Sequence, residues 1–385
     1  MMVREASGHS MRMSIWVVSQ KFSGFCPMGD ESLFFFPICR LTNLNMVERG
    51  KNMKNNKHIR RILTLLLVLA HLLVFTACSS TPSGEKDVLK AVIIKQLDHA
   101  SLDEIANAIE ERFETYATEK GVQVEVSIVS GQNDPTILKQ LAEQAIAQEA
   151  DVIIPIATLA AQITTGSAKG TGIPVVYAAI SDPEGAGLTS LENVTGTSDA
   201  LNTEFIFRMI FAMDPQIQKV GLLYSLSEAN SIKPIEDAKK ILTEKGVPFV
   251  EATAETQDEV RAAVSLLQAE QVEAIFTPTD NVIMAAELSI YEDLIRAGIP
   301  HYAGADSFVR NGAFATCGVN YTDLGVRTAE LALDAALSGT SGMEDYYLMD
   351  GGIITVNTET ATALGLNDSV FSGMGELIEV ITTED

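Results

Sequence analysis

The chain has 385 residues, with 27 Lys and Arg against 51 Asp and Glu. Residues 1–77 hold 10 of the basic and 4 of the acidic residues, so the remainder holds 17 against 47, a net charge of −30. A surface this negative repels phosphate backbones and excludes a nucleic-acid partner. The length is sufficient for two α/β lobes with a substantial core.

The amino terminus is typical of an export signal and not of a folded element. Residues 53–78 begin with a basic stretch and continue as an apolar run, residues 62–77, which has the length of a signal-peptide core and is short for a membrane span. Small residues precede Cys78, which resembles the lipidated cysteine of bacterial lipoproteins. We therefore predict a lipid anchor on Cys78, with a plain amino-terminal membrane anchor as the alternative.

Two further segments flank this signal. Residues 79–87 are polar and are predicted to be a tether. Residues 1–52 precede a signal that should begin the chain, so we interpret them as an upstream extension, with Met53 or Met46 as the start. The location expected from these features is the extracytoplasmic face of a bacterial cell membrane.

The cysteines indicate neither a metal site nor a disulfide framework. Cys26, Cys39, Cys78 and Cys317 form no CxxC or Cys/His pattern, so zinc is not expected. Cys78 and Cys317 suit a lipid anchor and one buried thiol better than a disulfide. We expect no cofactor.

From residue 88 onward, short β-branched runs alternate with longer amphipathic segments, which is typical of parallel α/β architecture. Strands are predicted at residues 89–95, 123–129, 151–157, 173–179, 219–225, 249–254, 274–279, 299–304, 313–319 and 352–358. Helices are predicted at residues 101–121, 134–150, 231–246, 281–298 and 322–339. Several helices close on Lys-Gly or Ala-Gly, a helix stop signal. The pattern indicates two similar halves, residues 88–197 and 198–321.

Ligands of open parallel sheets bind beyond the carboxyl ends of the strands, where helix N-termini offer free N–H groups. The residues that follow the predicted strands are rich in hydroxyls, amides and carboxylates and contain almost no Arg or Lys. The candidate binding residues are Gln96, Asp98, His99, Thr158, Leu159, Ala160, Ser181, Asp182, Glu228, Asn230, Ser231, Thr279, Asp280, Asn281, Asp306 and Ser307. Ser, Thr, Asp and Asn are also standard helix N-caps, so the prediction depends on their recurrence in both halves.

The chemistry of this edge favours a zwitterionic ligand. A phosphate would recruit Arg or a glycine-rich loop, and neither is present. Asp306 or Asp280 could bind an ammonium group. A carboxylate could bind at the helix starts that carry Thr158, Ser181, Asn230 and Ser231. Replacing Asp306 by Ala is predicted to weaken binding by about 2 kcal/mol or more.

Several segments carry a specific resemblance. They are GTSD (196–199), VGLLYSLSEANSIKPIEDAKK (220–240), TPTDN (277–281), GADSFVRNGAFATCGVNYTDLG (304–325), QLDHASLDEI (96–105), IPIATLAAQ (154–162) and ISDPEGAGL (180–188). From about residue 88 to its end, the chain resembles the ABC-transporter substrate-binding lipoproteins of the tryptophan/tyrosine-uptake type. Glu184 and Cys317 depart from that family's pattern, and Glu184 could alter the polarity of the cleft.

The resemblance implies a type I periplasmic-binding-protein fold, with two Rossmann-like lobes whose parallel sheets are joined by three crossovers. In such folds residues 322–344 return to the lobe formed by 88–197, and residues 345–385 complete the lobe formed by 198–321. The resemblance also implies the substrate-binding component of an ABC importer. Its lobes would close on a small solute such as an aromatic amino acid, and it would dock on a membrane permease. We expect a monomer.

Two alternatives use the same fold, a sugar or nucleoside receptor and the ligand-sensing subunit of a signalling system. Sugar sites favour Trp as a stacking platform, and the single Trp of the chain, Trp16, precedes the signal. An enzyme such as a surface hydrolase is not expected. The chain has no GxSxG or HExxH motif, and neither His99 nor Glu228 has the sequence partners of a catalytic base.

Overall fold

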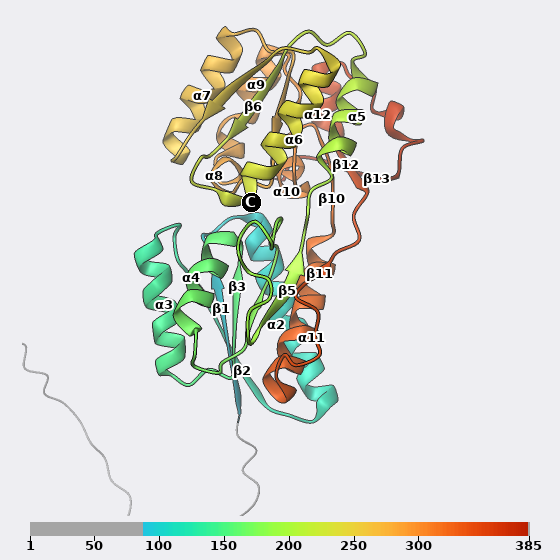
Figure 1. The fold of residues 1–385 in the computed structure, drawn as a ribbon. Coiled ribbons are helices and arrows are strands. Elements are labelled where there is room, and N and C mark those ends of the chain that lie inside the picture. The colour runs from blue at the N-terminus through green and yellow to red at the C-terminus, as the bar shows by residue number, and fades with distance from the viewer. Residues whose placement is uncertain (1–87, 384–385) are drawn as a thin grey trace, which may run out of the picture. The chain divides into compact units, whose positions relative to one another are not determined.

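The computed structural model describes residues 88–383, which form two α/β lobes (Figure 1). The predicted extension 1–52, the signal 53–78 with Cys78, and the tether 79–87 lie outside the described residues. Within the described part of the chain, no helix has the length and apolarity needed to cross a membrane.

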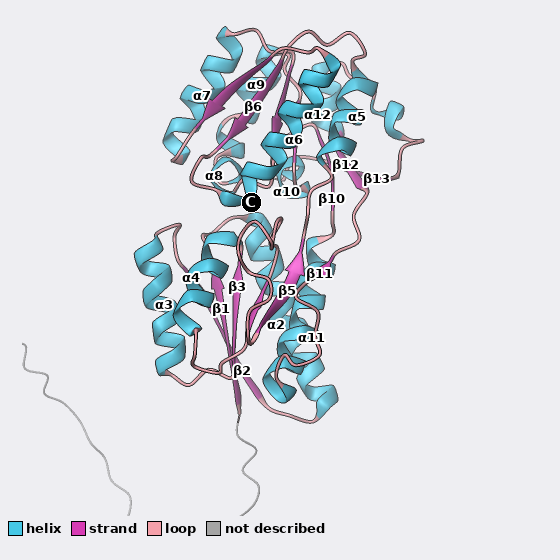
Figure 2. Ribbon diagram, in the orientation of Figure 1, coloured by secondary structure: helices cyan, strands magenta, loops and turns pink. Residues whose placement is uncertain are grey.

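The first lobe is a six-stranded parallel sheet with the strand order β11-β5-β4-β3-β1-β2 (Figure 2). Its elements are β1 (Leu89–Lys95), α2 (Ala100–Lys120), β2 (Val124–Ser130), α3 (Pro135–Ala147), β3 (Val152–Ile156), α4 (Thr158–Ala168), β4 (Val175–Tyr177), β5 (Val194–Ser198), α11 (Tyr321–Ser338) and β11 (Tyr347–Leu348). In β1, Ile93 belongs to the core that includes α2 and α11, and Ile94 belongs to the core that includes α3. Both faces of the strand are therefore covered, which explains its continuous apolar run.

The second lobe is a seven-stranded sheet with the order β13-β12-β10-β9-β8-β6-β7, parallel except for the β10–β12 pair. Its elements are α5 (Thr203–Met213), β6 (Val220–Tyr224), α6 (Ala229–Lys245), β7 (Phe249–Thr253), α7 (Gln257–Ala269), β8 (Ala274–Thr277), α8 (Asn281–Met284), η1 (Glu287–Ser289), α9 (Tyr291–Ala297), β9 (His301–Ala303), α10 (Asp306–Arg310), β10 (Ala315–Gly318), β12 (Ile353–Asn357), α12 (Thr358–Leu364), η2 (Asp368–Phe371) and β13 (Glu376–Val380). Phe207, Phe276 and Phe314 lie in its core. Cys317 is a buried free thiol, as predicted.

The chain passes between the sheets three times, after β5, after β10 and after β11. The predicted class of two parallel α/β lobes joined by three crossovers is therefore confirmed. One boundary differs from its predicted position. Because β11 pairs with β5, residues 345–348 lie with the first sheet, and the third crossing comes a few residues later than the sequence indicated.

Helix stop signals located several boundaries well. Helices α2, α6 and α9 end at Gly121, Gly246 and Gly298, whose φ angles of 72°, 70° and 74° are left-handed and favour glycine. The predicted helix 281–298 was wrong as a continuous element. It is divided into α8, η1 and α9, because the chain turns to bury Glu287 against His301, with 3.0 Å between Oε1 and Nδ1.

Helices α2 and α11 pack at very short range because Gly325 lies at their contact. A Cβ atom at Gly325 would lie 2.6 Å from Cβ of Ala108 and 2.8 Å from the carbonyl oxygen of Ile105. We expect Gly325→Ala to lower the free energy of unfolding by about 2 kcal/mol, since overpacking outweighs the helix propensity of Ala. Urea unfolding measures the change.

Gly166 in α4 provides the matched control, because a Cβ atom there would meet no atom within 4 Å. Gly166→Ala should therefore raise the free energy of unfolding by up to about 1 kcal/mol through helix propensity alone. Stability changes of the same sign in both variants would contradict the close packing of α2 and α11.

Candidate functional site

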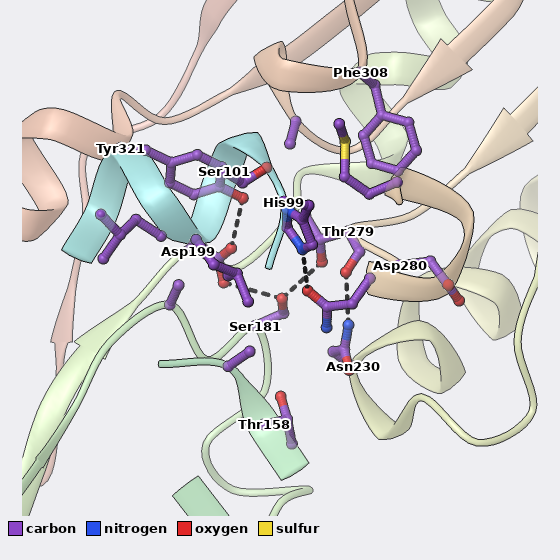
Figure 3. Close-up of a pocket in the computed structure, with 17 residues that line it drawn as sticks. His99, Ser101, Thr158, Ser181, Asp199, Asn230, Thr279, Asp280, Phe308 and Tyr321 are labelled. Atoms are coloured by element: carbon purple, nitrogen blue, oxygen red, sulfur yellow. Dashed lines mark hydrogen bonds between the residues drawn. The ribbon is translucent and has the colours of Figure 1, made fainter. Parts of the chain in front are cut away.

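A pocket lies between the lobes, at the carboxyl ends of strands from both sheets (Figure 3). Its wall is formed by His99, Ser101, Leu102, Ile105, Ala157, Thr158, Ala179, Ser181, Asp199, Asn230, Thr279, Asp280, Asn281, Met284, Ala305, Phe308 and Tyr321. The residues up to Asp199 come from the first lobe and its first crossover. The others come from α6, from the ends of β8 and β9, from α8 and α10, and from the start of α11.

The structure brings seven of the predicted binding residues into this wall. They are His99, Thr158, Ser181, Asn230, Thr279, Asp280 and Asn281. These seven residues lie together because parallel strands place the residues that follow them at one edge of each sheet.

Nine predicted residues do not line the pocket. They are Gln96, Asp98, Leu159, Ala160, Asp182, Glu228, Ser231, Asp306 and Ser307. Several of them have local structural roles instead. Asp98 is more than half exposed and pairs with Lys95, and Asp182 accepts a hydrogen bond from the N–H of Gly185 in its own turn.

Asp280 lines the pocket, but its carboxylate already accepts hydrogen bonds from other residues of the protein. Its carboxylate caps α8 by accepting the N–H groups of Val282 and Ile283, and it also accepts the N–H of Ser225 and the hydroxyl of Ser231. Burial raises the pKa of this carboxyl, and the four donors oppose that shift. Asp280 therefore has little capacity left to bind an ammonium group.

Asp306, unlike Asp280, lies outside the wall. It forms an ion pair with Arg310 one turn along α10, with 2.7 Å between Oδ2 and Nη1. Burial raises the pKa of Asp306 to about 6, against the opposing effect of Arg310. The carboxylate predicted to bind an ammonium group is therefore bound to a cation of its own helix.

Asp199, which the sequence analysis did not select, is a second carboxylate in the pocket wall (Figure 3). It is buried at the first crossover and accepts hydrogen bonds from the Ser181 hydroxyl at 2.9 Å and the Tyr321 hydroxyl at 3.1 Å. Burial raises its pKa, and both hydrogen bonds oppose the shift. Its position directly after β5 was the available signal, but the hydroxyl-rich β5 was not recognised as a strand.

The sequence analysis also missed the apolar wall, which we define as Leu102, Ile105, Met284 and Phe308. Leu102 and Ile105 are three residues apart near the start of α2 and therefore lie on one face of that helix. Met284 and Phe308 approach from α8 and α10 of the other lobe. The helical spacing of the first two was visible in the sequence, but apolar residues at that spacing usually indicate core.

Two buried acceptors in the wall have no partner among the described residues. They are Nδ1 of His99 and Oδ1 of Asn230. Burial lowers the pKa of His99 to about 4, so the imidazole is neutral, and its Nε2 lies 3.0 Å from Oδ1 of Asn281. Asn230 donates from Nδ2 to the carbonyl of Thr279 at 2.6 Å. Unpaired buried acceptors are costly, so both atoms are suited to receive a donor from a ligand.

Direct hydrogen bonds hold the lobes together around the pocket. They join Gln96 to Glu228, His99 to Asn281, Ser101 to Ser307, and Ser181 to Thr279. The cavity that they enclose measures about 20 Å³, whereas sites for small organic ligands measure about 300 Å³ or more. The structure is therefore a closed arrangement, and the lobes must separate to admit an organic ligand.

Glu228 is the buried carboxylate of these interlobe hydrogen bonds. Its Oε1 accepts from Nε2 of Gln96 at 2.8 Å, and its Oε2 accepts from Nδ2 of Asn281 at 2.6 Å. Burial, and then the nearby Asp280, raise the pKa of Glu228 to about 7.

Among residues 88–383 no group of three or more His, Cys, Asp or Glu side chains is placed to hold a metal ion.

Comparison with known proteins agrees with this geometry. A family model described as ABC transporter substrate binding protein matches residues 90–369. The tyrosine-binding protein of Clostridioides difficile is 29% identical over 283 residues, which cover 72% of this chain and 81% of that protein.

Solved structures extend the comparison. An ABC domain from Streptococcus pneumoniae in complex with L-Trp has a TM-score of 0.69 and 27% identity, covering 76% of this chain and all of that one. A solute-binding protein from Bacillus halodurans with bound myo-inositol has a TM-score of 0.56 at 15% identity, covering 74% of this chain and 99% of that one, which is a likeness of fold alone. Because the family model matches residues 90–369, the chain belongs to the family of ABC transporter substrate-binding proteins, which bind small molecules and are not enzymes.

Proposed function

We propose that this protein captures a zwitterionic aromatic amino acid, similar to tryptophan or tyrosine, and delivers it to the permease of an ABC importer. The observation that carries the proposal is the pairing of one buried carboxylate, Asp199, with an apolar wall in the same pocket. An amino acid presents a cation and an apolar side chain, and the pocket offers a partner for each.

Asp199 would bind the ammonium group. The hydroxyl groups of Ser181 and Tyr321 donate hydrogen bonds that fix the orientation of the carboxylate. Both donors are neutral, so they do not balance its charge. Oδ1 of Asn230 and Nδ1 of His99 could accept further ammonium protons. A buried carboxylate without a cation is unfavourable on its own, so a ligand ammonium would relieve a cost that the protein already bears.

The carboxylate of the ligand would bind at the start of α4. There the N–H of Leu159 donates to Oε1 of Gln96. The N–H of Ala161 donates to the carbonyl of Ala157, which is the first hydrogen bond of the helical pattern. The N–H groups of Thr158 and Ala160 make no hydrogen bond within the described residues. Free N–H groups at a helix N-terminus favour an anion.

The aromatic ring would contact the apolar wall, where Phe308 and Met284 can pack on a ring face or edge. The relatives that bind tyrosine and L-Trp support the same ligand class. Outside the described residues, the signal segment and Cys78 support a lipid-anchored extracytoplasmic location, with docking on the permease from that side.

A thermal-shift screen followed by calorimetry tests the proposal. L-Trp, L-Tyr or L-Phe should raise the unfolding temperature of the purified protein, because a ligand that binds only the folded state stabilises it by mass action. Nucleosides, inositol and common sugars serve as competing classes. A shift produced by a sugar or nucleoside and by no amino acid would reject the proposed ligand. Mass spectrometry of the amino-terminal peptide of the same preparation shows whether Cys78 carries acyl chains.

A further inference from the structure

Two alanines in the pocket wall have a backbone conformation that favours glycine. Ala157 has φ 75° and ψ 163°, and Ala179 has φ 58°. They follow the neighbouring strands β3 and β4, and both line the pocket with less than a tenth of their surface exposed. A Cβ atom is strained in this region, and most strongly at the angles of Ala157.

Hydrogen bonds on either side fix these conformations. The N–H of Ala157 donates to the carbonyl of Ala178 at 3.1 Å, and the carbonyl of Ala157 accepts the N–H of Ala161 at 3.0 Å. On the two sides of Ala179, Ala178 donates to the carbonyl of Pro155 and Ile180 donates to the carbonyl of Thr197. The backbone cannot relax to negative φ at either alanine without breaking strand or helix bonds.

Glycine at these positions would have the same backbone without the strain. The methyl group is the only difference between the two residues, and both methyl groups belong to a wall that a ligand must contact. We propose that the methyl groups of Ala157 and Ala179 determine specificity, by limiting the size of the group that the pocket accepts at the α-carbon end of its ligand. This inference rests on the proposed function, which places that end beside α4 and Ser181.

The variants Ala157→Gly and Ala179→Gly test this inference through two measurements with opposite expected signs. Relief of strain should raise the midpoint of thermal unfolding of the ligand-free protein by about 2–4 °C. Loss of a contacting methyl group should weaken binding of L-Trp, L-Tyr or L-Phe, whichever binds the wild type most tightly, by about fourfold. The α-methyl derivative of that amino acid should lose less affinity than its parent, because the variant has room for the added group.

Glu149 and Gln271 provide matched controls outside the pocket. Both are exposed and have similar left-handed φ angles of 56° and 58°. Glu149→Gly and Gln271→Gly should also raise the unfolding midpoint, while leaving the affinity for the amino acid and for its α-methyl derivative unchanged.

The inference is overturned if either pocket variant unfolds at a lower temperature than the wild type, or if its affinity for the ligand is unchanged. Calorimetry of the wild type alone decides the proposed function. If the wild type binds a solute of another class, aromatic amino acid binding is rejected, and the variants measured with that solute still decide the role of the methyl groups. Binding of no solute in the screen overturns both.

Discussion

Replacing Asp199 by Asn is expected to weaken binding of the amino acid ligand by at least 100-fold. The substitution keeps the shape of the side chain and its capacity to bond with Ser181 and Tyr321, and it removes the charge. Removing one partner of a buried charge pair costs about 2–5 kcal/mol, and 100-fold corresponds to about 2.7 kcal/mol. Isothermal titration calorimetry at neutral pH measures the change.

Two comparisons assign this loss to the ammonium group. A ligand analogue without the amine, such as 3-phenylpropionate, should bind the wild type weakly and Asp199→Asn with no further loss, since the interaction is already absent. Asp182→Asn is the matched control, because Asp182 bonds only within its own turn in the described structure, and its affinity should be unchanged.

The variant Asp306→Asn tests whether Asp306, which the sequence analysis suggested, or Asp199, which the structure favours, binds the ammonium group. Asp306 pairs with Arg310, which also forms an ion pair with Glu104 of the first lobe. Arg310 keeps Glu104 as a partner in Asp306→Asn, so an effect below about tenfold on ligand affinity is expected. If Asp306→Asn loses more ligand affinity than Asp199→Asn, Asp306 and not Asp199 binds the ammonium group.

The second large effect is a pH dependence of lobe closure that originates at Glu228. In the closed form its pKa is raised to about 7 by burial and by the facing Asp280. When the lobes separate, water reaches the carboxyl group, and its pKa moves back towards the ordinary value of 4.5. Between these values the closed form binds a proton that the open form does not, so falling pH favours closure by up to about tenfold per pH unit.

Small-angle X-ray scattering of the ligand-free protein between pH 8 and pH 5 measures this effect as a decrease in the radius of gyration. Glu228→Gln keeps a neutral side chain at every pH and should show no such response from this site. Other groups near the interface also have shifted pKa values: burial raises the pKa of Asp199, Asp280 and Asp306 and lowers the pKa of His99 to about 4. Comparing the two proteins at each pH cancels the contributions of groups that do not interact with Glu228, whereas Asp280 responds together with Glu228. Identical profiles would refute the role of Glu228.

The sequence predicted the architecture because its signals are local. Alternating apolar runs and glycine stops such as Gly121 and Gly246 depend on neighbours a few residues away. The segment 281–298 failed because its break depends on a long-range partner: Glu287 turns inward to bond with His301. No periodicity within the segment contains that information.

For the candidate site, the sequence predicted which edge of each sheet it occupies but not the role of each residue. The carboxylates Asp280, Asp306 and Asp199 all follow strand ends, and only their partners in space distinguish them. Asp280 accepts four hydrogen bonds from its own lobe, and Asp306 pairs with Arg310 outside the wall. Asp199 lines the pocket with hydroxyl groups as its side-chain partners. Which group each carboxylate contacts depends on the three-dimensional structure and cannot be read from the sequence.

The return of α11 to the first lobe affects how the protein matures. Because α11 packs against α2, the first lobe is incomplete until about residue 338 has left the ribosome, and the second lobe still requires β12 and β13. Contacts this distant in sequence form slowly. A nascent chain therefore lacks both complete cores through most of its synthesis, and a chain without a completed core can still thread through a narrow translocation channel.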